Sequence, residues 1–178
     1  VNNLALNYVT AHAIHSSSDT LDGANSGNIG VLNGAGTTLQ SLLSYARVTP
    51  VTLTGAGGNL VVDASSTPAV TQLDVANAGG LSDGANQITA PAGQGLAAHT
   101  FSGFGSVAAR SGTGSETINL LSLDAATPAS PAGAAPVTSL LLDANNATNT
   151  DAAGLDTLIV WTAPAAVAVS LRGGAADD

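Results

Sequence analysis

The chain of 178 residues has no cysteine, no methionine and no lysine, and its only arginines are Arg47, Arg110 and Arg172. Without cysteine, no disulfide framework can form. Twelve acidic residues bring the formal net charge to −9, which repels phosphate backbones, so no nucleic-acid partner is expected. Uninterrupted apolar runs of membrane-spanning length are also missing, so no membrane partner is expected.

Aromatic residues are scarce as well, at 3% of the chain, although hydrophobic residues make up 44%. Leucine, valine, isoleucine and alanine must therefore fill the core. Valine and isoleucine favour pleated sheet, and 21 glycines with 7 prolines supply frequent turns. The composition predicts an all-β protein, and the length fits one domain with an additional arm.

Residues 1–47 differ in character from the rest and are expected to form an amino-terminal arm. The first part, "NNLALNYVTAHAIH", fits either a strand or a helix, and the segment 16–36 is polar and rich in glycine. "TTLQSLLSYAR" then carries an apolar face at helical spacing, which predicts one short helix over about 38–47. The residues expected to contact a neighbouring subunit, a capsid or the β-domain are Leu39, Leu42, Leu43 and Tyr8.

From residue 48 to residue 178 the apolar residues alternate with a period of two. Short runs such as "NLVVDA", "VTQLDVA", "ETINLLSL" and "VTSLLLDA" are separated by segments rich in glycine and proline. Roughly eight to ten strands fit this region, which predicts a jelly-roll or β-sandwich domain. No fixed-period repeat is visible, and this argues against a regular solenoid.

The end of the chain, "DTLIVWTAPAAVAVSLRGGAADD", is predicted to be a β-hairpin that turns at Ala163–Pro164, with Trp161 at least half buried. The tail matches the calcium-repeat pattern G-G-x-G-x-D, except that Ala176 stands at the third glycine. Because such repeats are stable only in stacks, the end of a hairpin is the favoured interpretation.

No catalytic set is complete in the sequence. "GLSDG" matches the nucleophile-elbow pattern around Ser82, but the following "ANQITAPAGQG" cannot form the helix that this motif needs. The glycine-rich segments lack the lysine of a phosphate-binding loop. Glu116 is the only glutamate, so paired carboxylates for glycoside hydrolysis have little support. The chain is therefore not expected to be an enzyme.

Two groups of residues are candidates for a metal site. His12 and His15 would share one face if this segment were helical, because residues three apart on a helix do so. The segment 143–156 is rich in oxygen ligands, among them Asp143 and Asp151, although it fails the EF-hand pattern. A subunit contact and a polar loop are the favoured interpretations. No cofactor is therefore expected, with calcium as the alternative.

The closing strands combine an acid-threonine-leucine run, a tryptophan, a valine-rich run and an arginine, in Asp156, Thr157, Leu158, Trp161, Val167, Ala168, Val169 and Arg172. In this they resemble the carboxyl-terminal strands of bacteriophage head-decoration and tail-fibre proteins. The segment "AHAIHSSSDTLDGANSGNIG" also resembles the connecting segments of such fibres. The resemblance implies a structural protein of the virion, a homotrimer whose arm contacts the major capsid protein or another virion protein.

A calcium-associated surface-layer or adhesin domain on a bacterial cell surface is the alternative function. It shares the bias toward alanine, glycine, threonine, asparagine and aspartate, the absence of cysteine and the acidic balance. Calcium separates the two classes, because a surface-layer domain should lose order in a chelator and a decoration protein without calcium should not. A carbohydrate-binding sandwich also stays open on strand number alone.

Overall fold

A computed structural model describes residues 3–7, 12–19, 26–32, 38–67, 69–80, 82–111, 114–124, 136–144 and 155–173. The prediction of an all-β protein is confirmed, because every regular element in these ranges is a strand. The strands are β1 (Leu4–Asn7), β2 (His12–Asp19), β3 (Ser26–Leu32), β4 (Leu39–Tyr45), β5 (Val51–Thr54), β6 (Gly58–Asp63), β7 (Gln72–Asn77), β8 (Asn86–Thr89), β9 (His99–Ser102), β10 (Ser106–Arg110), β11 (Thr117–Leu120), β12 (Ser139–Asp143), β13 (Thr157–Val160) and β14 (Ala168–Arg172). No helix that could cross a membrane occurs in these ranges.

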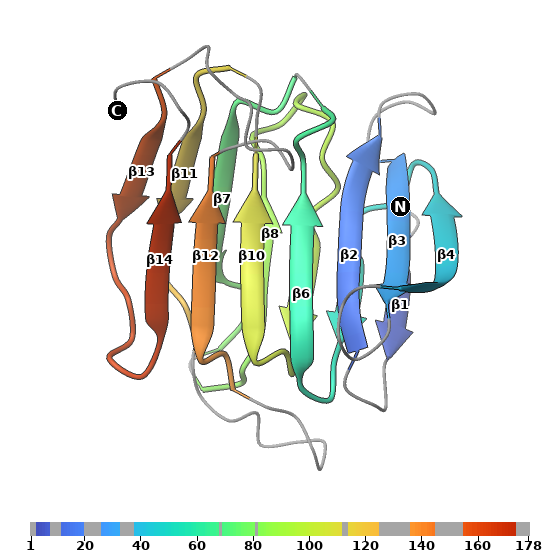
Figure 1. Cartoon of the computed structure of the whole chain (residues 1–178), viewed down its shortest axis with the longest axis horizontal. Helices are drawn as coiled ribbons and strands as arrows, with labels where there is room; N and C mark the ends of the chain where they lie inside the picture. The colour runs from blue at the N-terminus through green and yellow to red at the C-terminus, as the bar shows by residue number, and fades with distance from the viewer. Residues whose placement is uncertain are drawn as a thin grey trace.

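The strands form two seven-stranded sheets that lie face to face (Figure 1). The front sheet has the order β14-β12-β10-β6-β2-β3-β4, and the back sheet has the order β1-β5-β9-β8-β7-β11-β13. Eight of the twelve strand pairings are parallel. A jelly roll is built from antiparallel strands, so the pairing does not fit that part of the fold prediction.

The parallel pairing arises because the chain winds from one sheet to the other and back. In Figure 1, β10, β12 and β14 run upward in the front sheet, and β11 and β13 run downward behind them. From β10 onward, each new strand lies to the left of the preceding one in its sheet, so the winding is right-handed, as expected for crossovers between parallel strands. We call one back strand and the front strand that follows it a coil, so that β13 and β14 form the last coil.

The coils are unequal in length, which explains why the sequence shows no period. Five residues stack across the front sheet at one level, namely Ala13, Asn59, Ser106, Ser139 and Ala168. Their spacings along the chain are 46, 47, 33 and 29 residues. The stack is therefore solenoid-like in space, although the sequence argued against a regular solenoid.

Antiparallel strands interrupt the stack at two places. In the back sheet, β8 pairs antiparallel with both β7 and β9 and joins two parallel ladders. In the front sheet, β3 and β4 extend the sheet beyond β2 by antiparallel pairing. The parallel stacking of coils therefore ends at β2 on one side and at β14 on the other.

The predicted helix over about 38–47 is wrong, because residues 39–45 form the edge strand β4. The leucine spacing fits a helical face, but a helix of ten residues has little stability of its own. Pairing with β3 gives this segment backbone hydrogen bonds instead. Tyr45 is buried at the end of the strand, while the side chains of Leu39, Leu42 and Leu43 are exposed.

The segment before residue 47 belongs to the two sheets rather than to a detached arm. β1 pairs in parallel with β5, and β2 pairs in parallel with β6. Ile14 and Ile29 are buried in the same core as the later strands. The compositional change at residue 47 therefore does not mark a structural boundary.

The predicted closing hairpin is also wrong. β13 pairs with β11 in the back sheet, and β14 pairs with β12 in the front sheet, so the two strands do not pair with each other. The chain between them turns from one sheet to the other, with a Val167 N–H to Pro164 carbonyl hydrogen bond of 3.0 Å. Trp161 is 70% exposed instead of half buried. The tail from residue 174 to residue 178 lies outside the described residues.

The core lies between the sheets and consists of stacked aliphatic columns. On the front sheet, Leu60, Val107 and Leu140 occupy one level, and the next inward level holds Val62, Ala109 and Leu142. On the back sheet the corresponding columns are Leu73 with Ile118, and Val75 with Leu120. All ten of these side chains are buried. Aliphatic stacking thus fills most of the core of a chain that has few aromatic residues.

Glycine is required where the chain turns from the back sheet to the front sheet. The turn after β5 and the turn after β9 stack backbone to backbone, with Gly57 N–H donating to the Gly103 carbonyl at 2.7 Å. Gly103 has a positive φ of 75°, and a Cβ atom there would collide with the backbone carbonyl oxygen of Gly55. Only glycine satisfies both conditions.

Candidate functional site

Four charged residues of alternating sign line up across the front sheet, one at the end of each successive parallel strand. The order is Asp63 on β6, Arg110 on β10, Asp143 on β12 and Arg172 on β14. We call this row the ion-pair ladder. Arg110 NH1 lies 3.4 Å from Asp63 Oδ2, Arg110 Nε donates to Asp143 Oδ2 at 3.1 Å, and Arg172 NH1 lies 3.6 Å from Asp143 Oδ2.

The burial of the ladder changes from its middle to its end. The Asp63 and Asp143 side chains are almost fully buried, and the Arg110 side chain between them is mostly buried. The Arg172 side chain is 54% exposed. Because a charge out of water is stable only beside an opposite charge, each inner member depends on its neighbours. Arg172 lies on the edge strand β14 and pairs with Asp143 on the neighbouring strand β12.

The sequence-predicted metal candidates do not come together in the described part of the chain. Asp143 Oδ2 is bound to arginines, which makes it a member of the ladder rather than a free oxygen ligand. His12 and His15 belong to strand β2, so the helical spacing that suggested a shared site is absent. Asp151 lies outside the described residues, and no cluster of three acids or histidines suited to a metal occurs among the described ones.

Three of the four predicted contact residues lie on one strand. Leu39, Leu42 and Leu43 lie together on the edge strand β4 and are exposed. Tyr8 lies outside the described residues.

Ser82 lies in the turn between β7 and β8, where the Asp83 carboxylate accepts N–H groups from Gly80 and Ala85. A strand and not a helix follows, so the loop interpretation of "GLSDG" is confirmed.

Two further polar clusters hold the back sheet together. Asn119 Nδ2 donates to Asp74 Oδ1 at 2.7 Å across the pairing of β7 and β11. Asn86 and Asp124 form a buried pair, in which the Asp124 N–H donates to Asn86 Oδ1 and Asn86 Nδ2 donates to the Asp124 carbonyl. These bonds satisfy buried polar groups, which is a structural role.

One histidine is fully buried in the core. His99 stacks between Val51 and Ile88 in the back sheet, and its Nδ1 lies 2.7 Å from the Ala97 carbonyl oxygen. Its ring meets the Tyr45 ring edge-on, with centroids 6.5 Å apart. Burial lowers the pKa of His99 to about 4, so the ring is neutral at pH 7. Without solvent access it has no route to a substrate.

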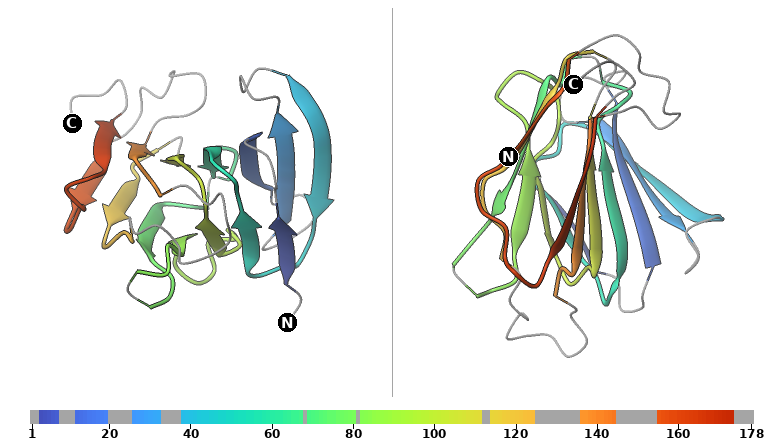
Figure 2. Two further views of the ribbon diagram at one scale, coloured as in Figure 1. Left: turned by 90° about the horizontal axis from the view of Figure 1, so that it is seen from below. Right: turned by 60° about the vertical axis from the view of Figure 1, so that its left-hand side comes forward.

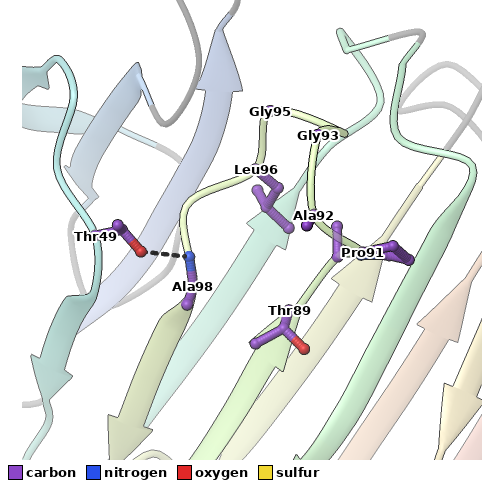
Figure 3. Close-up of a pocket in the computed structure, with 9 residues that line it drawn as sticks. Thr49, Thr89, Pro91, Ala92, Gly93, Gly95, Leu96 and Ala98 are labelled. Carbon is purple, nitrogen blue, oxygen red and sulfur yellow. Dashed lines mark hydrogen bonds between the residues drawn. The ribbon is translucent and has the colours of Figure 1, made fainter.

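A pocket of about 390 Å³ lies beside the loop that connects β8 and β9 (Figure 3). Small and apolar side chains dominate its wall, including Pro91, Ala92 and Leu96, and Thr49 Oγ1 accepts the Ala98 N–H at 3.4 Å. No titratable side chain lines it. A ligand site normally adds a few convergent polar groups to an apolar wall, so this pocket offers little basis for recognition.

The last coil leaves two of the core columns uncovered. Leu171 continues the column of Val62, Ala109 and Leu142, which are fully buried, but it is 52% exposed. Val160 continues the column of Val75 and Leu120 and is 41% exposed. The right-hand view of Figure 2 brings this end forward, with β13 and β14 as the outermost strands of the two sheets.

Backbone groups of the last coil are also directed outward. In a parallel pair, the N–H and C=O of one residue point to the same neighbouring strand. Ala168 N–H donates to the Thr138 carbonyl and the Arg172 carbonyl accepts the Ala144 N–H, so alternate residues of β14 face β12. The intervening Val169 and Leu171 therefore direct their N–H and C=O groups to the open side. Leu158 and Val160 do so on β13, by the same argument.

Exposed large apolar side chains gather at the two ends of the stack. Of the eight among the described residues, seven lie on or beside the outer strands, namely Leu39, Leu42, Leu43, Leu155, Val160, Trp161 and Leu171. We call the surface formed by β13 and β14 with Leu155 and Trp161 the open end. This surface and the ladder are the strongest candidate site in the described part of the chain.

The sequence did not point to this site. The signal is present, because "NLVVD", "SVAAR", "SLLLD" and "AVSLR" are four strands of one pattern that end in charges of alternating sign. Unequal spacing hides the pattern from any search for a fixed period. No protein-family model matches the chain, and neither a curated protein nor a solved structure matches it.

Proposed function

We propose that the chain is a non-enzymatic structural segment of a phage-like particle, of the tail-fibre or decoration class, that joins its neighbours through the ends of its β-stack. The observation that carries the proposal is the open end. Leu171 and Val160 are about half exposed there, although the residues that precede them in their columns are fully buried, and they lie beside outward-directed backbone groups. Such an edge favours pairing with another strand.

The opposite end of the stack supports axial growth. The pairings make β4 run in the same direction as β14, and β1 in the same direction as β13. A pair of strands added at either end, one to each sheet, can therefore keep the strand direction that each sheet already has. Stacked-coil proteins gain stability from each added neighbour, so a short stack of this kind is stabilised by extension.

The homotrimer implied by the resemblance is part of the same proposal. We expect three chains to meet through side chains on the faces of the stack, since its two ends serve the axial contacts. With three arginines in the whole chain, apolar contacts would supply most of the association energy. Such an assembly should weaken only slightly in high salt.

The test is the solution mass of the purified protein, together with its binding to bare particles of a matching phage. Leu171→Ser and Val160→Ser combined should abolish particle binding while preserving the fold, since both side chains are already exposed. Leu121→Ser is the matched control, because Leu121 is similarly exposed but directly follows β11, which is an inner strand of the back sheet. A monomer that binds no particle would overturn the proposal.

An exported bacterial adhesin segment is a second candidate. In its favour are the net charge of −9 and the absence of cysteine, which this class shares. Unfolding in the presence and absence of a chelator separates the candidates. Loss of stability in the chelator would support the calcium-associated surface class.

A further inference from the structure

We infer that the open end binds a parallel β-strand that carries a carboxylate in line with Arg172, and so extends the ion-pair ladder by one acid. This inference rests on the proposed end-to-end assembly and specifies the chemistry of the partner strand. Three features of the open end define that strand: its direction, its apolar side chains and its charge.

The direction of the partner strand follows from the backbone of β14. Val169 and Leu171 direct N–H and C=O groups to the open side, spaced as in the parallel pairing of β12 with β14. A parallel strand can form backbone hydrogen bonds with the N–H and C=O groups of both residues. Its own residues would then stand in the same register as those of the inner strands. The partner strand is therefore a fifth member of the parallel series from β6 to β14 in the front sheet.

Apolar side chains follow from the core columns. A side chain beside Val169 would continue the column of Leu60, Val107 and Leu140, and one beside Leu171 would continue the next column. From β6 to β12, the members of these columns are leucine, valine or alanine. The partner strand therefore carries aliphatic residues at these two alternate positions.

Charge follows from the ladder. Arg110 has an acid on each side, at 3.4 Å and 3.1 Å, whereas Arg172 contacts Asp143 at 3.6 Å on one side and is half exposed on the other. A carboxylate on the fifth strand would give Arg172 the same surroundings as Arg110. Arginine forms strong charge-assisted bonds with carboxylates, which makes this position selective.

The chain's own first edge does not meet these requirements. β4 has the sequence "LQSLLSY" and β1 has the sequence "LALN", and neither contains a charged residue. β12, with the sequence "SLLLD", does meet them, and it lies on the side of β10 that corresponds to the open side of β14. The inferred partner is therefore an acid-ended strand of the β12 type and not the first edge of a second copy.

The experiment titrates the ¹⁵N-labelled full chain with a capped peptide that copies residues 138–144, "TSLLLDA", and with the same peptide carrying Asp143→Asn. The acidic peptide should shift the amide signals of Val169 and Leu171 and bind about fivefold more tightly than the amide peptide. In the Arg172→Gln protein the two peptides should bind equally. Ser170→Thr, on the same strand, is the control that should keep the preference.

Each other outcome overturns the inference in a distinguishable way. Equal binding of both peptides to the wild-type protein would refute the role of charge while leaving end-to-end assembly in place. Stronger binding of both peptides to Arg172→Gln would mean that Arg172 protects the edge against pairing. If neither peptide binds but the protein still joins particles, the open end is not the axial contact and only the inference fails. If it also fails to join particles, the proposed function fails with it.

Discussion

Arg110 Nε donates a hydrogen bond of 3.1 Å to Asp143 Oδ2, and the carboxylate that accepts it is almost completely buried. The two residues lie on adjacent parallel strands, 33 positions apart in the sequence. Arg110 reaches the buried Asp63 on its other side. One guanidinium therefore compensates two carboxylates that have little access to water.

Arg110→Leu should destabilise the fold strongly. The substitution removes the cation between Asp63 and Asp143, which lie on the two strands that flank β10. Breaking a buried pair by removing one partner costs about 3–5 kcal/mol. Urea unfolding measures the change. Arg172→Gln is the matched comparison and should cost less than about 1 kcal/mol, because half-exposed pairs contribute little. Equal losses in the two variants would contradict the dependence of the inner ladder on Arg110.

His99 should make stability depend on pH between about 6.5 and 4. Burial lowers its pKa to about 4, so over this window the unfolded chain binds a proton that the folded chain does not. Stability is therefore lost as the pH falls, by about 3 kcal/mol over the whole window. Urea midpoints measured at a series of pH values test this.

The control for this prediction is His99→Phe, which keeps a ring of similar size next to Tyr45. Acidic residues titrate in both proteins, so the difference between the two pH profiles isolates the histidine. The wild-type profile should be steeper between pH 6.5 and 4 and parallel to the variant above pH 7. Parallel profiles throughout would show that the ring is accessible to protons in the folded state.

Gly103→Ala should be far more harmful than Gly93→Ala. Both residues have positive φ, 75° and 92°, so both substitutions incur backbone strain of about 1 kcal/mol. At Gly103 the added Cβ also meets the Gly55 carbonyl, whereas nothing lies within 4 Å at Gly93. We expect a further loss of about 2 kcal/mol or more at Gly103, measured as the difference between the unfolding free energies. Similar losses would disprove the backbone contact between the stacked turns.

Trp161→Ser should change the stability of the isolated chain by less than about 1 kcal/mol, because the side chain is mostly exposed. The fluorescence of Trp161, the only tryptophan, should be red-shifted in the folded protein. Phe104→Ala is the contrasting variant and should cost about 3–5 kcal/mol, since Phe104 is fully buried. A blue-shifted tryptophan would show that the open end is already covered in solution.

Strand content could be predicted from the sequence because it depends on local patterns. "NLVVDA" and "VTQLDVA" alternate with a period of two between glycine-rich turns, and the structure has β6 and β7 there. Leu39, Leu42 and Leu43 misled the prediction, because their spacing suits a helical face and only the neighbouring β3 shows that this segment is an edge strand. Trp161 misled it as well, since its exposure depends on which strand lies beyond β13.

The pairing of strands could not be predicted by these means. "DTLIV" and "AVSLR" are close in sequence and separated by a short turn, which is typical of a hairpin. Whether such a turn joins two strands of one sheet or passes from one sheet to the other depends on the ladders already formed by β11 and β12. The four charges of the ladder become neighbours only through this stacking.

Because the charges of the ladder alternate, only an even change in the number of coils keeps opposite charges next to each other. Inserting one coil, or deleting one, within the series from Asp63 to Arg172 would bring two like charges together where the carboxylates are buried. Inserting or deleting two coils together would preserve the alternation at every position. The unit by which such a stack can be lengthened, by duplication in evolution or by design, is therefore a pair of coils.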